Sequence, residues 1–241
     1  MGSKSLDGNL VKRAHSTMKY SEKDIEDLMK CQDSVTGPHY FLDNFFYIQH
    51  ATRGRLQFVP FDYQVELIDN YHNNRYSINM LGRQMGKTTC AAGYLLWYAM
   101  FVPDSTILVA AHKYTGAQEI MQRIRYAYEA CPNYIKAGVV TYNKGSLDFE
   151  NGSRIVSATT TANTGRGMSI SLLYLDEFAF VPPNIAEEFW TSITPTLSTG
   201  GKAIITSTPN SDEDQFALIW KGANKTEDAY GNQTELGVNG F

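Results

Sequence analysis

The sequence predicts an α/β fold with a mostly parallel central sheet that is flanked by helices. Strand-like apolar segments alternate with helical segments from residue 62 to residue 206, which is the order that builds such a sheet. One of these strands, Ser77 to Leu81, leads through a glycine-containing loop into the apolar helix Thr88 to Phe101. The chain has 241 residues and is 43% apolar, so it can bury a sizeable core.

Residues 1–50 are predicted to form an N-terminal helical segment. Ser21 and Asp24 have the spacing of a capping box, which begins a helix that runs to Lys30. The aromatic-rich stretch Tyr40 to His50 is interpreted as a second helix. It would pack against the core or against a neighbouring molecule, and core packing is the simpler interpretation.

Residues 51–223 are expected to form the core domain. It begins with an amphipathic helix over Asp62 to Tyr71 and has further helices over Gly116 to Ala130 and Ile185 to Leu197. Besides Ser77 to Leu81, the predicted strands are Thr106 to Ala111, Val139 to Tyr142, Ser146 to Glu150, Arg154 to Ala158, Leu172 to Leu175 and Lys202 to Thr206. Asn151-Gly152 is predicted as a hairpin turn.

Residues 224–241 are polar and contain glycine, so we expect a truncated lid or a linker there. The stretch builds no further strand pattern, and we interpret the sequence as a fragment whose C-terminal part is missing.

Composition and charge exclude several classes of protein. The net charge of −4 leaves no global basic surface for nucleic acid, so any DNA contact must come from local patches or from another domain. Candidates are Lys12, Arg13, Arg123, Arg125, Lys136 and Lys144, although solvated side chains would look the same. Three widely spaced cysteines fit no zinc or disulfide pattern, and the apolar run 90–102 is too short to span a bilayer.

The segment Leu81 to Thr89, LGRQMGKTT, resembles a phosphate-binding loop. Gly86-Lys87-Thr88 matches the end of the signature G-x-x-x-x-G-K-[ST], while Leu81 stands where the first glycine is expected. Lys87 would reach the β- and γ-phosphates and Thr88 would ligate Mg²⁺. The other expected phosphate-binding residues are Gly82, Arg83, Gln84, Gly86 and Thr89. The alternative, a chance match in a surface turn, fits the flanking strand and helix less well.

Two carboxylates, Asp176 and Glu177, follow directly after a buried apolar strand. Ligands of α/β sheets bind at this edge, so Asp176 is predicted to hold Mg²⁺ and Glu177 to activate the attacking water. The alternative is a strand that simply ends in polar residues. Combined with an upstream phosphate-binding loop, the catalytic interpretation is favoured.

Thr206, Ser207 and Thr208 end the next apolar strand and could sense the γ-phosphate. The sequence alone favours the alternative, a strand-terminating turn with Pro209 as its stop signal. Gln64 precedes the loop strand, and its amide can read an adenine edge while Tyr63 or Phe61 stacks on the base. A solvent-facing glutamine is the simpler alternative.

Two arginines are candidates for stabilising transition-state charge. Arg83 lies within the loop and would act in cis, or would pair with an acidic neighbour such as Glu177. Arg166 lies in a glycine-flanked loop and could reach the nucleotide of a neighbouring subunit, or could be an ordinary surface arginine.

Together these residues resemble the ATPase domain of tailed-phage large terminases, the motors that package DNA, over about Tyr40 to Trp220. Such proteins carry an arginine in the loop, as Arg83, and an acidic pair after an apolar strand, as in LLYLDE. Gln64 matches their adenine-reading glutamine, and Thr206 to Thr208 match their coupling motif. The resemblance implies a P-loop ATPase core of the additional-strand, catalytic-glutamate type. It also implies a C-terminal nuclease domain, which we expect to be absent from this chain together with its activity.

The resemblance implies ATP and Mg²⁺ as ligands, and double-stranded DNA, a portal protein and a small terminase subunit as partners. The chain would form a homo-oligomeric ring on the procapsid, in the host cytoplasm and transiently at the portal vertex, without a membrane. Two alternatives stay open: a superfamily-two helicase-like ATPase, and a nucleotide-binding assembly module that docks on a portal.

Overall fold

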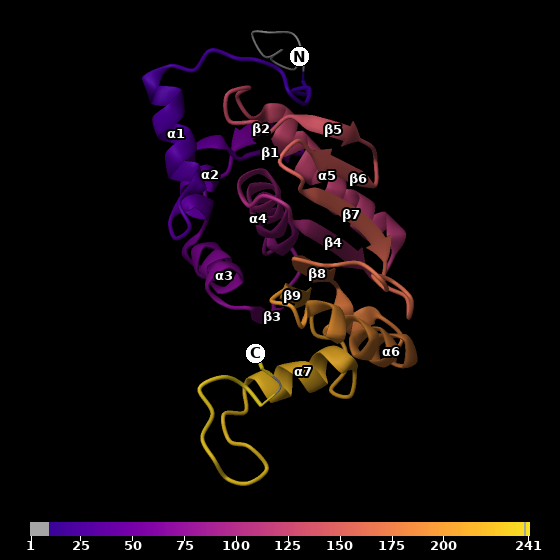
Figure 1. The fold of residues 1–241 in the computed structure, drawn as a ribbon. Coiled ribbons are helices and arrows are strands. Elements are labelled where there is room, and N and C mark those ends of the chain that lie inside the picture. The colour runs from indigo at the N-terminus through magenta and orange to yellow at the C-terminus, as the bar shows by residue number, and fades with distance from the viewer. Residues whose placement is uncertain (1–9, 239) are drawn as a thin grey trace. The chain divides into compact units, whose positions relative to one another are not determined.

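The computed structural model describes residues 10–238, 240 and 241, and it confirms the α/β class (Figure 1). Seven strands form a mostly parallel sheet in the order β3-β9-β8-β4-β7-β6-β5. These strands are β3 (Tyr76–Met80), β4 (Thr106–Ala111), β5 (Val139–Tyr142), β6 (Ser146–Phe149), β7 (Arg154–Thr159), β8 (Leu172–Asp176) and β9 (Lys202–Ser207). The helices are α1 (Glu22–Gln32), α2 (Gly37–Phe45), α3 (Asp62–Asn73), α4 (Lys87–Phe101), α5 (Tyr114–Ala130), α6 (Pro183–Ile193) and α7 (Gln215–Ala223).

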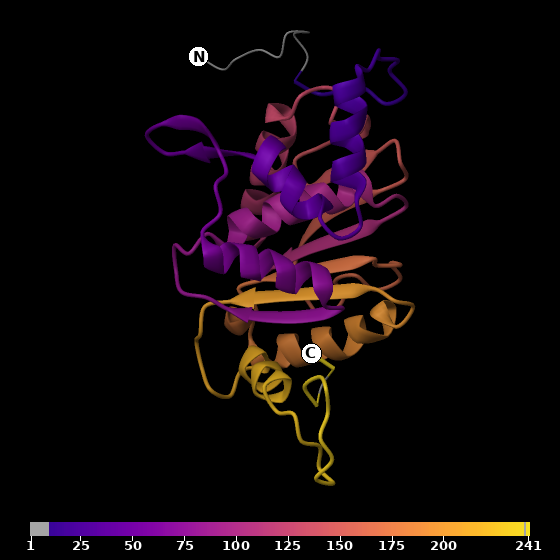
Figure 2. The same cartoon turned by 90° about the vertical axis from the view of Figure 1, so that its left-hand side faces the viewer.

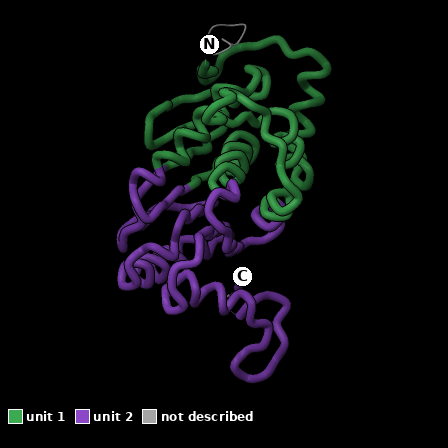
Figure 3. The backbone as a smooth tube through the Cα atoms, turned by 180° about the vertical axis from the view of Figure 1, so that it is seen from behind, with its two compact units in different colours: residues 1–68, 88–107, 118–156 green, residues 69–87, 108–117, 157–241 purple. Residues whose placement is uncertain are grey.

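By their internal contacts, the residues divide into two compact units (Figure 3). Unit 1 comprises residues 1–68, 88–107 and 118–156, and unit 2 comprises residues 69–87, 108–117 and 157–241. Residues 1–9, which begin the predicted N-terminal segment, and Asn239, in the predicted lid or linker, lie outside the described residues.

In unit 1, helix α1 is capped at its start and is held by hydrogen bonds from two tyrosines. The capping box predicted at Ser21 is present, because the Ser21 hydroxyl accepts from the Asp24 N–H and the Asp24 carboxylate accepts from the Ser21 N–H. Farther along α1, buried Asp27 accepts hydrogen bonds from the hydroxyls of Tyr40 at 2.7 Å and Tyr134 at 3.1 Å. These bonds satisfy the buried carboxylate and fix α1 to α2.

The prediction of one helix over Tyr40 to His50 is wrong for its second half. Helix α2 ends at Phe45, and Tyr47–His50 forms strand β1, which pairs antiparallel with β2 (Gly54–Gln57). The ring of buried Phe46 packs edge-on against Phe58 at 5.4 Å and closes the base of this hairpin. Figure 2 shows the hairpin as a purple loop that reaches out from α2. Aromatic residues are common in strands as well as in helices, so the composition of this segment does not show where the helix ends and the strand begins.

Lys136 was a candidate DNA contact, and the structure contradicts this. Its side chain is 1% exposed, and its ammonium donates to the carbonyl oxygens of Leu10 and Glu129 and to the Asn133 amide oxygen. Burial lowers the pKa of the Lys136 ammonium. Within unit 1, the residue therefore fixes the backbone at Leu10 to the end of α5.

The β6–β7 hairpin of unit 1 is confirmed, with Gly152 in the left-handed region at a φ of 82° within the predicted turn. The three cysteines are free and buried. Within the described residues, no helix is long and apolar enough to cross a membrane.

Unit 2 is built on the parallel strands β3, β9 and β8, whose apolar side chains pack with α6 and α7 in one core. The helix predicted over Ile185 to Leu197 is α6 followed by a 3₁₀ turn, Thr194–Leu197. Helix α7 was not predicted. It begins at an Asp214 cap that accepts from the Ala217 N–H, and the described residues beyond 223 are irregular. The parallel strands bring their carboxyl ends to one edge, which positions the site described below.

Gly93 in α4 provides a test of packing in unit 1. A Cβ atom there would lie 2.5 Å from a methyl carbon of Leu42 and 3.0 Å from the Phe46 ring, both in the buried core. We expect Gly93→Ala to lower the free energy of unfolding by about 1–2 kcal/mol, because overpacking outweighs the gain in helix propensity.

The matched control is Gly116→Ala in α5, where the new Cβ would meet only the Ala111 methyl group at 3.4 Å. This change should raise the free energy of unfolding by about 0.5–1 kcal/mol. Urea denaturation of both variants measures the difference, and equal effects would contradict the packing argument.

Candidate active site

The glycine loop connects β3 to α4 in the strand–loop–helix order that was predicted. The Leu81 N–H donates to the Ser207 carbonyl oxygen at 3.1 Å, which continues the pairing of β3 with β9 into the loop. Gln84 and Gly86 have left-handed φ angles of 62° and 75°. Glycine adopts this conformation readily, whereas for Gln84 it costs on the order of 1 kcal/mol or more. The loop backbone is therefore held in an unusual curve immediately before the helix begins.

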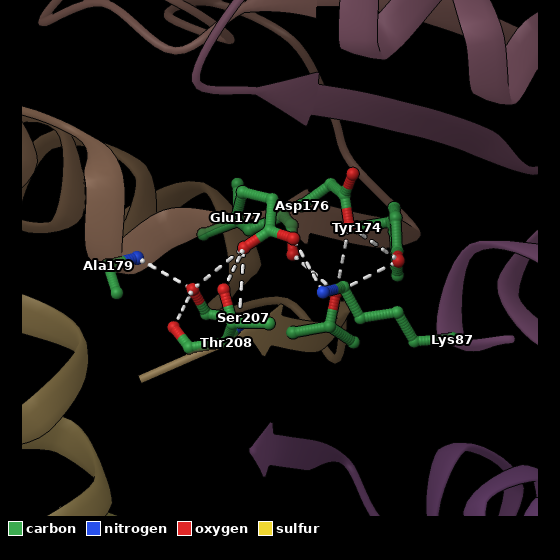
Figure 4. Close-up of polar contacts among 9 residues, drawn as sticks. Lys87, Tyr174, Asp176, Glu177, Ala179, Ser207 and Thr208 are labelled. Carbon is green, nitrogen blue, oxygen red and sulfur yellow. Dashed lines mark hydrogen bonds and ion pairs between the residues drawn. The ribbon is translucent and has the colours of Figure 1, made fainter. Parts of the chain in front are cut away.

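Lys87 is the first residue of α4 and is 7% exposed. Its ammonium nitrogen lies 2.5 Å from Oε1 of Glu177 (Figure 4). An unpaired lysine this deeply buried would be costly, so the carboxylate stabilises the ammonium. Glu177 thus forms its ion pair with Lys87 and not with Arg83, the pairing considered from the sequence.

Glu177 follows β8 with a left-handed φ of 51°, and its second carboxylate oxygen faces the end of β9. Oε2 accepts from the Thr208 N–H at 3.1 Å and from the Thr208 hydroxyl at 3.0 Å, and the Ser207 hydroxyl lies 3.3 Å away. The Ser207 oxygen also accepts from the Ala179 N–H at 3.2 Å. The predicted coupling residues Ser207 and Thr208 therefore hold the predicted catalytic carboxylate directly (Figure 4).

Asp176 is the last residue of β8 and lies in register with Thr206 of β9. The Tyr174 hydroxyl donates to Oδ1 of Asp176 at 3.2 Å and lies 2.9 Å from the Thr206 hydroxyl oxygen. Thr206 Oγ1 is also 3.3 Å from Oδ1 of Asp176. Tyr174 was given no role from the sequence. The signal was available, because residues two apart on a strand share a face.

The environment moves the pKa values of the two carboxyls apart. Burial, followed by the neighbouring Glu177 charge, raises the pKa of Asp176. Burial also acts to raise the pKa of Glu177, but the Lys87 ammonium and the hydrogen bonds from Thr208 outweigh it and lower that pKa. Opposite shifts in adjacent acids are typical of catalytic pairs.

Asp176 fits a role in holding Mg²⁺. Within the described residues, both hydrogen bonds to its carboxylate go to Oδ1, so Oδ2 is available to a hard cation. A divalent cation would favour the ionised form of Asp176, against the burial and the Glu177 charge that raise its pKa. In the described part of the chain, no group of three or more His, Cys, Asp or Glu side chains forms a metal cluster.

The two candidate arginines of unit 2 are both exposed. Arg83 lies in the loop among the exposed residues Gly82, Gln84 and Met85. Arg166 lies between two glycines with left-handed φ angles, and its guanidinium is 3.7 Å from the Glu188 carboxylate. Since both partners of this pair are more than half exposed, it adds little stability, and Arg166 can exchange it for another anion.

The remaining predicted site residues belong to unit 1. Gln64 is 5% exposed, and its amide oxygen accepts from the Phe61 N–H at 3.1 Å, so it caps the start of α3. The rings of Phe61 and Tyr63 stack at 5.8 Å. Thr88 and Thr89 are half-buried in the first turn of α4, and the Thr89 hydroxyl accepts from Arg123 at 3.4 Å.

The family described as "Terminase large subunit, T4likevirus-type, N-terminal" matches residues 78–235. The chain is also similar to three solved structures, each below 25% identity, which shows likeness of fold alone. The Thermus phage P74-26 large terminase ATPase domain has 20% identity and a TM-score of 0.57, over 91% of this chain and 83% of that one. The HK97 bacteriophage large terminase has 19% identity and a TM-score of 0.64, over 79% of this chain and 40% of that one.

The third structure is the large terminase of a thermophilic bacteriophage in complex with ADP, with 14% identity and a TM-score of 0.53. The match covers 65% of this chain and 41% of that one. The chain therefore spans about two fifths of this protein and of the HK97 protein, and most of the P74-26 domain.

Tyr174→Phe tests the buried network around Asp176. We expect the free energy of unfolding to fall by about 1–3 kcal/mol near neutral pH, because the ionised carboxylate loses a hydrogen bond. Asp176 has a raised pKa in the folded protein, so its protonated form is favoured there. As the pH falls below that pKa, Asp176 becomes neutral and the deficit should shrink.

Urea titrations of wild type and variant at several pH values measure this effect. Tyr128→Phe is the control, because its buried hydroxyl donates to the neutral Ala137 carbonyl at 2.7 Å. The loss of free energy of unfolding in Tyr128→Phe should not depend on pH over the range in which Asp176 is protonated. A Tyr174→Phe deficit that stays constant as Asp176 is protonated would refute the proposed coupling.

Proposed function

The chain belongs to the terminase large subunit family, T4likevirus-type, N-terminal, and on this basis we propose that it hydrolyses ATP to drive double-stranded DNA into a procapsid. The observation that carries the proposal is the carboxylate of Glu177, held between the lysine of the glycine loop and the hydroxyls that end β9. This arrangement joins a nucleotide-binding group, a candidate base and a candidate coupling segment.

ATP binding would change the partners of Lys87. The γ-phosphate carries more negative charge than a carboxylate, so the ammonium would move to the β- and γ-phosphates. Without the ammonium, the pKa of Glu177 rises toward that of an effective general base. The resting ion pair therefore keeps the base weak until the nucleotide arrives. The large terminase of the thermophilic bacteriophage was solved in complex with ADP, which supports a nucleotide as the ligand.

In the hydrolytic step, Glu177 would orient a water molecule and take its proton as the water oxygen attacks the γ-phosphorus. The bond from that phosphorus to the bridging oxygen breaks, and ADP leaves with the electron pair. Mg²⁺, held by Asp176 and Thr88, would neutralise the phosphate charge. Arg83 would stabilise the charge on the transferring group in cis, and Arg166 would do so in trans.

Coupling to movement would pass through the end of β9. Because Thr208 donates two hydrogen bonds to Glu177 and Ser207 links it to Ala179, a change at the carboxylate reaches the segment that leads to α7. We propose that loss of the γ-phosphate shifts this segment and thereby moves DNA. The proposed partners are a portal protein, a small terminase subunit and further copies of this chain in a ring, at the portal vertex in the host cytoplasm.

Glu177→Gln tests the catalytic role. We expect the turnover of Mg·ATP to fall by about 10²- to 10⁴-fold, because the amide cannot accept a proton, while ATP affinity changes by no more than a few-fold. Steady-state phosphate release and equilibrium binding measure the two effects. Glu187→Gln, an exposed glutamate of the same unit, should behave as wild type. Undiminished turnover in Glu177→Gln would instead favour a passive nucleotide-binding assembly module.

Mixtures of subunits test the roles of the two arginines. Arg83→Ala should reduce turnover by at least about 10-fold with little change in ATP affinity, since contacts made only in the transition state affect rate. Mixed with wild type at constant total protein, it should give activity in proportion to the wild-type share.

The activity of mixtures of wild type with Arg166→Ala should be lower than the wild-type share predicts, because each variant subunit would also impair its neighbour. Strict proportionality for Arg166→Ala would refute trans action, and a fall below proportion for Arg83→Ala would reverse the assignment.

A further inference from the structure

Unit 1 contains a groove of about 530 Å³ between strand β1 and helix α5. One wall consists of the successive residues 46–51. A strand turns alternate side chains to opposite faces, so a run of successive residues indicates that the edge of β1, and not one of its faces, borders the groove. The other wall is formed by residues 119, 122, 123 and 126, which have the spacing of one helix face.

The edge of β1 that borders the groove has no strand partner. No residue of β2 lines the groove, and within the described residues the sheet of this hairpin has only two strands (Figure 2). The Phe58 N–H donates to the Phe46 carbonyl oxygen at 3.0 Å, and hydrogen-bonded and non-hydrogen-bonded positions alternate in an antiparallel pair. In this register Tyr47 and Gln49 occupy non-hydrogen-bonded positions, so their backbone N–H and C=O groups point away from β2.

The side chains of the groove suit an extended polypeptide. Phe46 is buried, and Tyr47 and Tyr126 are half-buried, so the groove offers aromatic surface to apolar side chains. Gln122 is exposed on α5, and its amide can donate to and accept from a backbone. A free strand edge gives affinity through backbone hydrogen bonds, and pockets beside it select alternate side chains of the added strand.

The charges around the groove favour an acidic ligand. Residues 46–57 contain two arginines, one histidine and no acidic residue, and the guanidinium of Arg55 lies 5.1 Å from the centre of the Tyr47 ring. Among the lining residues Glu119 is the only acid, and it forms a 2.7 Å ion pair with Arg123. Both partners are well exposed, so the pair is weak. Arg123 can therefore turn to a carboxylate of a ligand.

We propose that this groove binds an extended, acidic segment of a partner protein, which adds to β1 as a third strand. The segment would pair with the outward backbone groups of Tyr47 and Gln49, and its carboxylates would meet Arg55 and Arg123. Strand β1 has four residues, so the paired length is about 13 Å. The proposal goes beyond ATP hydrolysis, because every residue that carries it belongs to unit 1.

Amide hydrogen exchange, followed by NMR, tests the pairing on the wild-type protein. The probe is a short synthetic peptide with glutamates at alternate positions and valines between them. At saturation it should slow exchange of the Tyr47 and Gln49 amides by at least about 10-fold, because hydrogen-bonded amides exchange only on opening. The Arg55 and Gln57 amides, at the non-hydrogen-bonded positions of β2, are the internal control and should not change.

The same peptide with methylated backbone nitrogens keeps the charge and cannot donate to β1. It should bind more weakly and should not protect Tyr47 or Gln49. Equal protection by both peptides, or protection of neither amide by the unmethylated peptide, would overturn the added strand.

Two substitutions separate the contribution of the backbone from that of charge, with binding measured by fluorescence anisotropy. Gln49→Pro removes an outward N–H without removing a bond to β2, and should weaken peptide binding by at least about 10-fold. Its control is Gln57→Pro, which removes an outward N–H from the other edge of the hairpin. Urea denaturation of both variants checks that they are folded.

Arg123→Ala should weaken binding of the glutamate peptide by about 3- to 10-fold, because a charge-assisted hydrogen bond is lost. Arg125→Ala is the matched control, an arginine of the same helix that does not line the groove. It should bind as wild type does. Equal effects of the two substitutions, or equal affinity for a peptide with lysines in place of the glutamates, would refute the acidic ligand.

Two other occupants give different results. If a DNA duplex shifts the NMR signals of residues 46–51 and 119–126 and the glutamate peptide does not, the groove contacts nucleic acid and the proposal is wrong. If Tyr47 and Gln49 become protected with rising protein concentration alone, in step with self-association in sedimentation, the occupant is a second copy of this chain and the proposal is also wrong.

Discussion

The ion pair between Lys87 and Glu177 is the contact on which the functional edge of unit 2 depends. The lysine is almost fully buried, and an ammonium in that position needs a compensating charge. Glu177 supplies it, and the hydrogen bonds from Thr208 then fix the remaining carboxylate oxygen. Three chain segments that are distant in sequence thus meet at one charged group. This requires β3, β9 and β8 to be neighbours and parallel, as they are.

The two adjacent acids illustrate how position sets charge. Asp176 ends a strand inside the core, and burial disfavours its ionised form. Glu177, one residue later, turns toward an ammonium and three donors, which favour its ionised form. The protein itself supplies the positive partner of the second acid, whereas burial favours the neutral form of the first.

Much of the fold could be predicted because its signals are local. Apolar runs such as Thr106–Ala111 and the capping box at Ser21 report the conformation of their own segment. Strand β1 was predicted as helix because its own residues favour both conformations. Only its pairing with Gly54–Gln57 distinguishes the two. The Lys87–Glu177 pair and the Tyr174 network depend on residues far apart in sequence. Motifs predicted which residues form the candidate site, and topology decided which of them touch.

The left-handed backbone at Gln84 and Glu177 also limits how these positions can vary. Glycine would suit the backbone at either position but would remove the side chain, and at Glu177 it would leave Lys87 without its partner. β-Branched residues would suit neither the backbone nor the chemistry. Conformational strain limits substitution at both positions, and the ion pair with Lys87 limits it further at Glu177. These two positions should therefore vary much less than the exposed loop residues around them.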